Sequence, residues 1–213
     1  MAITKREALS IVYQCAKKYK SELINHSLLF ICADKHMHTY AIEVTFDASN
    51  FLHLTGFQTR DKGISSGDFF QRCIDKRLSE NDFDFATDGT TSLKLDVLPQ
   101  LVSRNLSAKM IGDYNGSQPK LYTEKLAGNV VGCIGFIKDK KTQRYVPNTV
   151  LKGRTDDYTA KADRIMVTYR KAASETKYTE IVYAAKKVAW QEIRFPTGYE
   201  DLPLPAVENH TAE

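Results

Sequence analysis

Near the N-terminus, apolar and polar residues alternate with the period of an α-helix. Leu9 and Val12 begin an apolar series that continues at spacings of three and four residues, with lysines among the remaining positions. Thr4 and Glu7 precede this series at the spacing of a capping box, in which each residue caps the backbone of the other. The pattern predicts a first helix near residues 5 to 23.

Two β-rich runs follow this helix. Residues 27 to 32 and 40 to 46 are rich in branched and aromatic side chains, and a short polar segment between them predicts a hairpin. Ser65 and Asp68 then have the spacing of a helix cap, ahead of an apolar series that begins at Phe69. We expect a second helix there.

The segment Asn50-Phe51-Leu52-His53-Leu54-Thr55-Gly56 sets one histidine and one hydroxyl two residues apart in an apolar run. At the two-residue period of a strand, His53 and Thr55 point to the same face. Histidine titrates nearest neutrality, so His53 is a candidate proton carrier beside a hydroxyl. The alternative is a core histidine whose ring is hydrogen-bonded to a backbone carbonyl. The segment alone leaves both interpretations open.

The pattern from residue 90 to 105 fits both a strand and a helix. Apolar residues alternate in its first half and repeat with helical spacing in its second half. A proline is tolerated in the first turn of a helix, where its missing N–H costs little. Because Pro99 lies in this segment, we place the start of the helix near Asp96.

From residue 109 onward the pattern becomes that of β-strands. Runs of alternating and β-branched residues are separated by turn-forming residues. The runs lie at residues 109–114, 120–126, 130–137, 145–152, 164–171 and 178–185. Helices and a hairpin followed by an antiparallel sheet predict the α+β class. We expect one domain over residues 1–195 and a loose acidic tail over residues 196–213.

Composition agrees with one globular domain. Of the 213 residues, 42% are hydrophobic and 26% are charged, which allows a sizeable core. No apolar run approaches the roughly 18 residues of a membrane-spanning helix, so we expect a cytoplasmic protein with no membrane partner. The four cysteines lie in separate apolar segments without a Cys-x-x-Cys pair, which predicts reduced, buried thiols.

Positive charge is concentrated in one part of the chain. Residues 1–103 hold 12 lysines and arginines against 13 aspartates and glutamates, and residues 104–194 hold 18 against 9. The remaining residues hold four acids and no base. A positive region suits a polyanion, because phosphate neutralisation supplies most sequence-independent affinity for nucleic acid. An ordinary solvated surface is the alternative.

A second polar constellation lies in the strand-like segment Tyr145-Val146-Pro147-Asn148-Thr149-Val150-Leu151-Lys152. If this segment meets the one around His53, the pair offers an acid or base (His53), a cation for a phosphate (Lys152) and neutral donors (Thr55, Asn148 and Thr149). Such chemistry needs no metal. The alternative is a turn or edge-strand pair followed by a lysine at the solvated end of a strand.

Metal and nucleotide sites are not indicated by the spacing of their usual ligands. Cys32, His36 and His38 are close in sequence, but no fourth zinc ligand is placed by spacing. The chain has no phosphate-binding glycine loop and no metallopeptidase motif. We therefore expect no metal and no cofactor.

The two polar segments resemble one family when they are taken with Lys94-Leu95, Lys125-Leu126-Ala127-Gly128 and Gly135-Phe136. The chain is similar, from the first helix to Phe195, to the fourth group of phage-associated barnase–EndoU–colicin–RelE-like nuclease domains of phages and bacterial mobile elements. The resemblance implies a barnase/EndoU/RelE-like ribonuclease fold. It also implies metal-independent cleavage of RNA, in which the 2′-hydroxyl attacks the adjacent phosphate and leaves a 2′,3′-cyclic phosphate.

Matched onto this chain, the resemblance implies catalytic roles for His53, Thr55, Asn148, Thr149 and Lys152. Lys94 matches a recurrent lysine of unassigned role, and it joins Arg144 and Tyr145 as a candidate for substrate binding. The chain departs from the two-histidine acid and base scheme of some relatives, because it lacks a second well-placed histidine.

The first functional hypothesis is a toxin-like endoribonuclease that acts on host RNA, with tRNA and mRNA as candidate targets. The second is a non-catalytic phage protein that binds and inhibits a host defence component, such as a CRISPR system. A plain nucleic-acid-binding module is the third. Convergence of His53, Thr149 and Lys152 on one cleft favours the enzyme, whereas dispersed side chains favour the binder.

Overall fold

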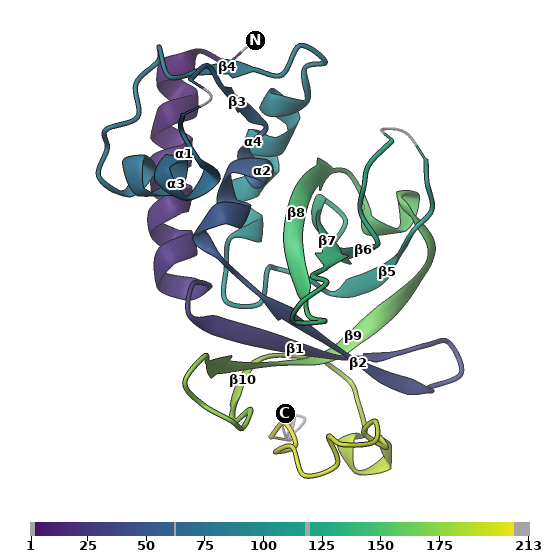
Figure 1. The fold of residues 1–213 in the computed structure, drawn as a ribbon. Coiled ribbons are helices and arrows are strands. Elements are labelled where there is room, and N and C mark those ends of the chain that lie inside the picture. The colour runs from purple at the N-terminus through teal and green to yellow at the C-terminus, as the bar shows by residue number, and fades with distance from the viewer. Residues whose placement is uncertain (1–2, 62, 118–119, 207–213) are drawn as a thin grey trace, which may run out of the picture.

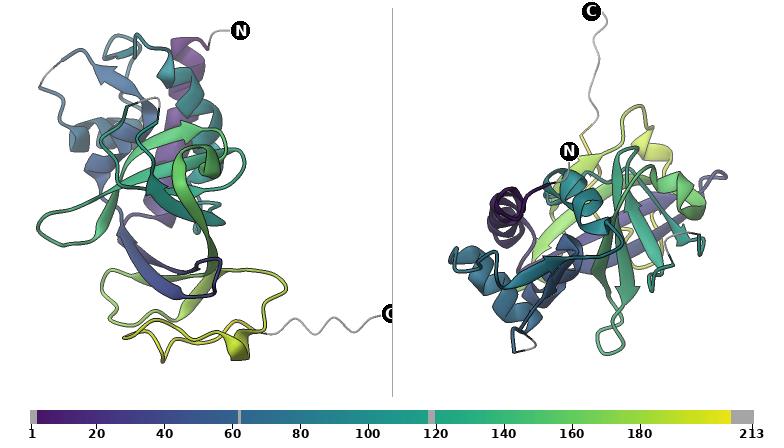
Figure 2. Two further views of the ribbon diagram at one scale, coloured as in Figure 1. Left: turned by 90° about the vertical axis from the view of Figure 1, so that its right-hand side faces the viewer. Right: turned by 90° about the horizontal axis from the view of Figure 1, so that it is seen from above.

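The computed structural model describes residues 3–61, 63–117 and 120–206 and places a group of helices beside a β-barrel (Figure 1). The helices are α1 (Lys5–Glu22), α2 (Phe51–Thr55), α3 (Ser66–Ile74) and α4 (Thr90–Leu101), with 3-10 turns η1 (Ala48–Asn50), η2 (Thr155–Asp157) and η3 (Trp190–Glu192). The strands are β1 (His26–Ala33), β2 (Thr39–Thr45), β3 (Phe57–Thr59), β4 (Phe83–Phe85), β5 (Met110–Tyr114), β6 (Lys125–Gly128), β7 (Gly132–Lys138), β8 (Tyr145–Lys152), β9 (Thr159–Ala172) and β10 (Glu180–Ala184). Two further views show the helices gathered on one side of the barrel (Figure 2).

Helices α1 and α3 confirm the two helices that their caps predicted. The Thr4 hydroxyl accepts a hydrogen bond from the Glu7 amide at 3.2 Å, and the Glu7 carboxylate accepts one from the Thr4 amide at 2.8 Å. The Ser65 hydroxyl caps α3 in the same way by accepting from the Asp68 amide at 3.1 Å. The apolar face of α1 packs against α3 and α4, so most of its stability comes from this burial rather than from helix propensity.

The predicted α+β class is right, but the sheet is a closed barrel and not an open antiparallel sheet. In the described chain, seven strands form a ring in the order β1-β2-β8-β7-β6-β5-β9. The pairing of β1 with β9 closes this ring. Neighbouring strands in this ring are antiparallel except β2 and β8, which pair in parallel at Val44 and Tyr145. Strand β9 permits closure because it is 14 residues long. Its first half pairs with β5 and its second half with β1.

Helix α4 begins at Thr90 and not near Asp96 as expected. Its N-cap residue is Gly89, and the Asp88 carboxylate just before it accepts hydrogen bonds from the Thr90 amide at 3.0 Å and from the Thr90 hydroxyl at 2.7 Å. Pro99 therefore lies near the end of the helix, where its missing N–H removes one intrahelical bond. The helix also buries the side chains of Leu95, Leu98 and Leu101. This tertiary burial outweighs the loss of one hydrogen bond.

The segment around His53 is helix α2 and not the predicted strand. Phe51 and Leu54 are buried three residues apart, which is the spacing of one helix face. Gly56 ends the helix with φ +73°, in the left-handed region that glycine adopts at little cost. Positions two residues apart in an α-helix point about 200° apart. His53 and Thr55 therefore face opposite sides of α2 and do not share a face.

The C-terminal segment lies against the outer side of β1 and β9. Alternate residues of β1 point outward and are buried in a second hydrophobic cluster, against which Tyr199 packs. The Tyr169 hydroxyl donates to the Pro203 carbonyl at 2.7 Å. Tyr199 and Leu202 pack on this cluster, because a strand that is apolar on both faces needs cover on both. Most other residues between 196 and 206 are exposed, so the expected loose tail stays a prediction. Residues 207–213 of the expected tail lie outside the described part of the chain.

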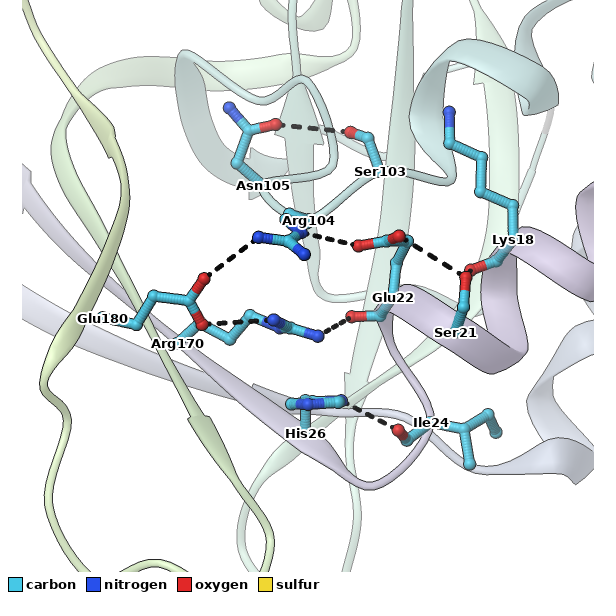
Figure 3. A network of polar contacts seen from close by, with 10 residues as sticks. All are labelled: Lys18, Ser21, Glu22, Ile24, His26, Ser103, Arg104, Asn105, Arg170 and Glu180. Carbon is cyan, nitrogen blue, oxygen red and sulfur yellow. Dashed lines mark hydrogen bonds and ion pairs between the residues drawn. The ribbon is translucent and has the colours of Figure 1, made fainter.

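A network of ion pairs joins the end of α1 to β9 and β10 (Figure 3). Arg170, which is only 7% exposed, donates to the Glu180 carboxylate and to the Glu22 carbonyl, both at 3.1 Å. Arg104 donates to the Glu22 carboxylate at 2.8 Å and to the Glu180 carboxylate at 3.3 Å. Each of these two cations therefore has its counter-charge within the protein.

Candidate functional site

A cleft of about 580 Å³ lies where α2 and α4 meet β8. Helix α2 contributes His53, helix α4 contributes Lys94, and β8 contributes the segment from Asn148 to Lys152. Lys120 and Leu121, which precede β6, line the cleft as well, as does Tyr158 before β9. In the described chain, the fold therefore brings together groups from five parts of the sequence.

His53 lines this cleft as a partly buried side chain. Its imidazole makes no hydrogen bond to any residue that the structure describes, so it is not the carbonyl-bonded core histidine of the alternative interpretation. Burial lowers the pKa of His53 below its ordinary value of 6.5, and the positive charge of Lys94 lowers it further. The ring is therefore neutral at pH 7, which is the state that accepts a proton.

Lys94 reaches the same end of α2. Its ammonium donates to the His53 carbonyl at 2.9 Å. This carbonyl belongs to the last turn of the helix, whose carbonyls lack intrahelical donors. Gly56 leaves room for the lysine, because a Cβ at that position would lie 3.1 Å from Lys94 Cδ. Burial lowers the pKa of Lys94 to about 8, and the negative charge of Asp88 opposes this shift.

A β-bulge places Asn148 and Thr149 at the cleft. Gly135 pairs with Thr149 and Phe136 pairs with Pro147, so Asn148 is the extra residue of β8. Bulges re-aim side chains and also accommodate a proline within a sheet. A Cβ on Gly135 would lie 2.5 Å from Thr149 Cγ2. The absence of a side chain at Gly135 is therefore a condition for this arrangement.

The polar groups on this bulge have different surroundings. The Asn148 amide donates to the Tyr122 carbonyl, and its oxygen accepts from the Thr123 hydroxyl at 3.1 Å. Asn148 thus holds the segment that carries Lys120 and Leu121 against β8. Thr149 is only 4% exposed, and its hydroxyl has no hydrogen-bond partner among the residues that the structure describes.

The charges around the cleft are mostly positive. Lys94, Lys120 and Lys152 line it with His53, whereas Asp88 is the single carboxylate of its described lining. Lys152 forms an ion pair with Asp96, and both side chains remain about half exposed. Within the described chain, no carboxylate lies within 4.0 Å of the ammonium of Lys94 or of Lys120. The cleft therefore offers positive charge to an anionic ligand.

The structure gathers some of the predicted site residues and leaves others apart. His53, Lys94, Asn148, Thr149 and Lys152 line one cleft.

Three others lie elsewhere. Thr55 is fully buried, and its hydroxyl donates to the Leu52 carbonyl at 2.8 Å and accepts from the Phe57 amide at 3.1 Å, so it closes α2. Arg144 and Tyr145 lie at the opposite end of β8 from Lys152, where the Arg144 guanidinium is 3.4 Å from Glu43.

Sequence reasoning missed Asp88, Lys120 and Tyr158 as members of this lining. Asp88 had a detectable signal, because the sequence Asp88-Gly89-Thr90 is typical of a helix start. Lys120 was placed in a predicted strand, whereas β6 begins only at Lys125. No local pattern marks Tyr158, whose hydroxyl donates to the Lys152 carbonyl at 2.7 Å.

Three further expectations concern metal sites, membrane-spanning helices and cysteines in the described residues. They contain no group of three or more His, Cys, Asp or Glu side chains placed to hold a metal ion. None of their helices combines the length and the apolar character that crossing a membrane requires. Cysteines are buried and unpaired, as predicted, at positions Cys15, Cys32, Cys73 and Cys133.

A helical layer on a barrel, with a cationic cleft and a neutral histidine between them, defines an α+β protein whose site suits a phosphate chain. Comparison with family models agrees with this class. The chain belongs to the phage-Barnase-EndoU-ColicinE5/D-RelE like nuclease4 family, whose model matches residues 11–187. The resemblance found in the sequence is thereby confirmed, and a nucleic-acid substrate is the one that the family name indicates. Searches of curated proteins and of solved structures produced no significant match.

Proposed function

We propose that this protein is a phage or mobile-element endoribonuclease that cleaves RNA in the cleft between α2, α4 and β8 by attack of the 2′-hydroxyl. The observation that carries the proposal is the convergence on one cleft of a neutral histidine, three lysines and a threonine hydroxyl that has no hydrogen-bond partner in the described chain. The family supplies the nuclease class. RNA and its 2′-hydroxyl are the substrate and nucleophile that we propose, because a neutral histidine can take the proton of that hydroxyl and the cationic groups can stabilise the charge on the phosphate.

His53 is the base in the proposed reaction. Its neutral imidazole takes the proton of the 2′-hydroxyl as that oxygen forms a bond to the adjacent phosphorus. Negative charge then builds on the non-bridging phosphate oxygens, and the Lys152 ammonium and the Thr149 hydroxyl stabilise it. Asn148 has a positioning role, because its amide holds the segment that carries Lys120 beside the cleft. The products are a 2′,3′-cyclic phosphate and a 5′-hydroxyl.

A toxin-like effector that acts on host RNA in the bacterial cytoplasm fits this chemistry. The cleft favours this role over that of a non-catalytic inhibitor of a host defence component, because His53, Thr149 and Lys152 line the same cavity rather than separate surfaces. A protein that only docks on a partner has no need of a histidine held in its proton-accepting state.

The test is incubation of the purified protein with total bacterial RNA in EDTA. We expect fragments whose 3′ ends carry a cyclic phosphate. His53→Ala should abolish nearly all cleavage, while His36→Ala should cleave like the parent, because His36 is exposed in the turn between β1 and β2. Intact RNA after incubation with the parent protein would favour the non-catalytic binder.

A further inference from the structure

The proposed reaction uses a base but leaves the departing 5′ oxygen without a proton donor. An alkoxide is a poor leaving group, so cleavage of this bond normally requires a general acid. His53 is the one histidine among the described residues that line the cleft. His26, His36 and His38 lie on or beside the hairpin of β1 and β2. Among the described residues, no second histidine lines the cleft to serve as the acid.

Lys94 is held close to His53, the proposed base. Its ammonium donates to the backbone carbonyl of His53 itself, at 2.9 Å. Its stem passes over the end of α2, where Gly56 leaves space for it. Both groups also line the same cavity. His53 thus supplies the imidazole, and its backbone carbonyl holds the Lys94 ammonium nearby.

Burial, rather than the charges near it, lowers the pKa of Lys94, and the negative charge of Asp88 opposes this shift. The titratable and charged groups that line the cleft around it are His53 on α2, Asp88 before α4, Lys120 before β6, Lys152 on β8 and Tyr158 before β9. The Asp88 carboxylate accepts hydrogen bonds from Thr90, and Lys152 is paired with Asp96. Lys94 thus has two lysines and a histidine around it and no carboxylate of the described chain in ion-pair contact.

We propose that Lys94 is the general acid of the cleft and donates its proton to the 5′ oxygen of the scissile bond. This inference rests on the proposed ribonuclease function and completes its proton balance. His53 gains the proton of the 2′-hydroxyl as the 2′-oxygen–phosphorus bond forms. Lys94 loses a proton to the 5′ oxygen as the phosphorus–5′-oxygen bond breaks. Exchange with water afterwards returns His53 to its neutral state and Lys94 to its charged state.

The alternative role for Lys94 is structural, because a lysine at the end of a helix caps its free carbonyls. The two roles predict different pH dependences. With Lys94 as the acid, the rate rises with pH as His53 becomes neutral and falls again above a pH of about 8, where the lysine loses its proton. With Lys94 as a cap only, the high-pH decrease does not follow the lysine.

Lys94→Arg separates these roles. Arginine keeps the positive charge and can still donate to the His53 carbonyl, but it does not release its proton in this pH range. We expect the variant to cleave a short RNA with one mapped cut site about 10²- to 10⁴-fold more slowly than the parent. The high-pH decrease in rate should disappear, and thermal unfolding and RNA binding should match those of the parent.

The decisive substrate carries sulfur in place of the 5′ oxygen at the cut site, because a thiolate leaves without a proton. On this RNA, Lys94→Arg should cleave at close to the parent rate, whereas His53→Ala should stay slow. Equal losses by Lys94→Arg on both substrates would overturn the role of Lys94 and leave the ribonuclease proposal standing. A parent protein that cleaves neither substrate would overturn both proposals.

Discussion

The cleft and the ion-pair network at the end of α1 contain the same kinds of side chain in opposite situations. In the network, Arg104 and Arg170 meet glutamates, and the imidazole of the neighbouring His26 lies 2.9 Å from the Ile24 carbonyl (Figure 3). In the cleft, the imidazole of His53 and the ammonium of Lys94 have no such partners within the described chain, apart from the lysine bond to the His53 carbonyl.

This contrast separates a structural use of charge from a functional one. A charge that has several partners inside the protein contributes to the fold and has little left to offer a ligand. Lys152 differs, because it has a single carboxylate partner and remains about half exposed. A partly buried charge without a counter-ion costs stability, and such groups gather at functional sites. Changes in the cleft should therefore reduce cleavage and spare stability, whereas changes in the network should do the reverse.

The largest effect is expected for His53→Ala. Cleavage of RNA should fall about 10²- to 10⁴-fold, because the base is lost. The free energy of unfolding should change little, since Phe51 and Leu54 still anchor α2. His26→Ala is the matched control, and it should keep the parent rate while lowering the midpoint of urea unfolding. A similar loss of activity in both variants would erase the contrast between the two histidines.

Lys152→Met is expected to follow, with cleavage reduced about 10²- to 10³-fold. The variant keeps the apolar stem and removes the cation that we propose for the phosphate, and it leaves Asp96 without its partner to repel a bound phosphate. The double variant with His53→Ala should lose less than the product of the two single losses, because both residues act on one step. Single-turnover rates measure this coupling, and simple multiplication of the losses would place Lys152 outside the reacting site.

Arg170→Met should act on stability instead. The buried guanidinium makes two hydrogen bonds, one of them to a charged partner, so its loss should lower the free energy of unfolding by about 2 kcal/mol. Arg104→Met is the matched control with a smaller effect, since the side chain of Arg104 is 59% exposed. Urea unfolding gives both values. Below the unfolding transition, both variants should cleave RNA at the parent rate, and a slowed reaction would link the network to the chemistry.

The smallest effect is expected for Lys120→Ala, measured as RNA binding by the His53→Ala protein. If Lys120 contacts one phosphate, the slope of log affinity against log salt should become shallower by about one. Lys17→Ala is the control, because Lys17 is exposed on α1. An unchanged slope for Lys120→Ala would mean that this side of the cleft does not meet the RNA backbone.

The parts of the fold that sequence patterns predicted are those encoded locally. The caps at Thr4 and Ser65 defined α1 and α3, and the alternating run ending at Lys152 matched β8 from end to end. Helix α2 was missed because five residues span little more than one helical turn. Its apolar content therefore fitted a strand equally well.

The cleft was predicted in part for a related reason. His53, Asn148, Thr149 and Lys152 were identified as chemically suited groups, and the barrel brings them together. Thr55 was included because it matches the family motif and because a strand would have turned it toward His53. Lys120, in contrast, joins the site through the long-range contact that Asn148 makes with the segment before β6. Such contacts depend on barrel closure, which no local periodicity reveals.

The most direct test of the central claim uses one RNA with a mapped cut site and a copy in which only the attacking nucleotide is 2′-deoxy. Both are incubated with the parent protein in EDTA. Attack by the 2′-hydroxyl predicts that the all-RNA strand is cut and that the deoxy copy stays intact at that bond while binding with the same affinity. Cleavage of the deoxy copy at the same bond would contradict the account, because the nucleophile would then not be the 2′-hydroxyl.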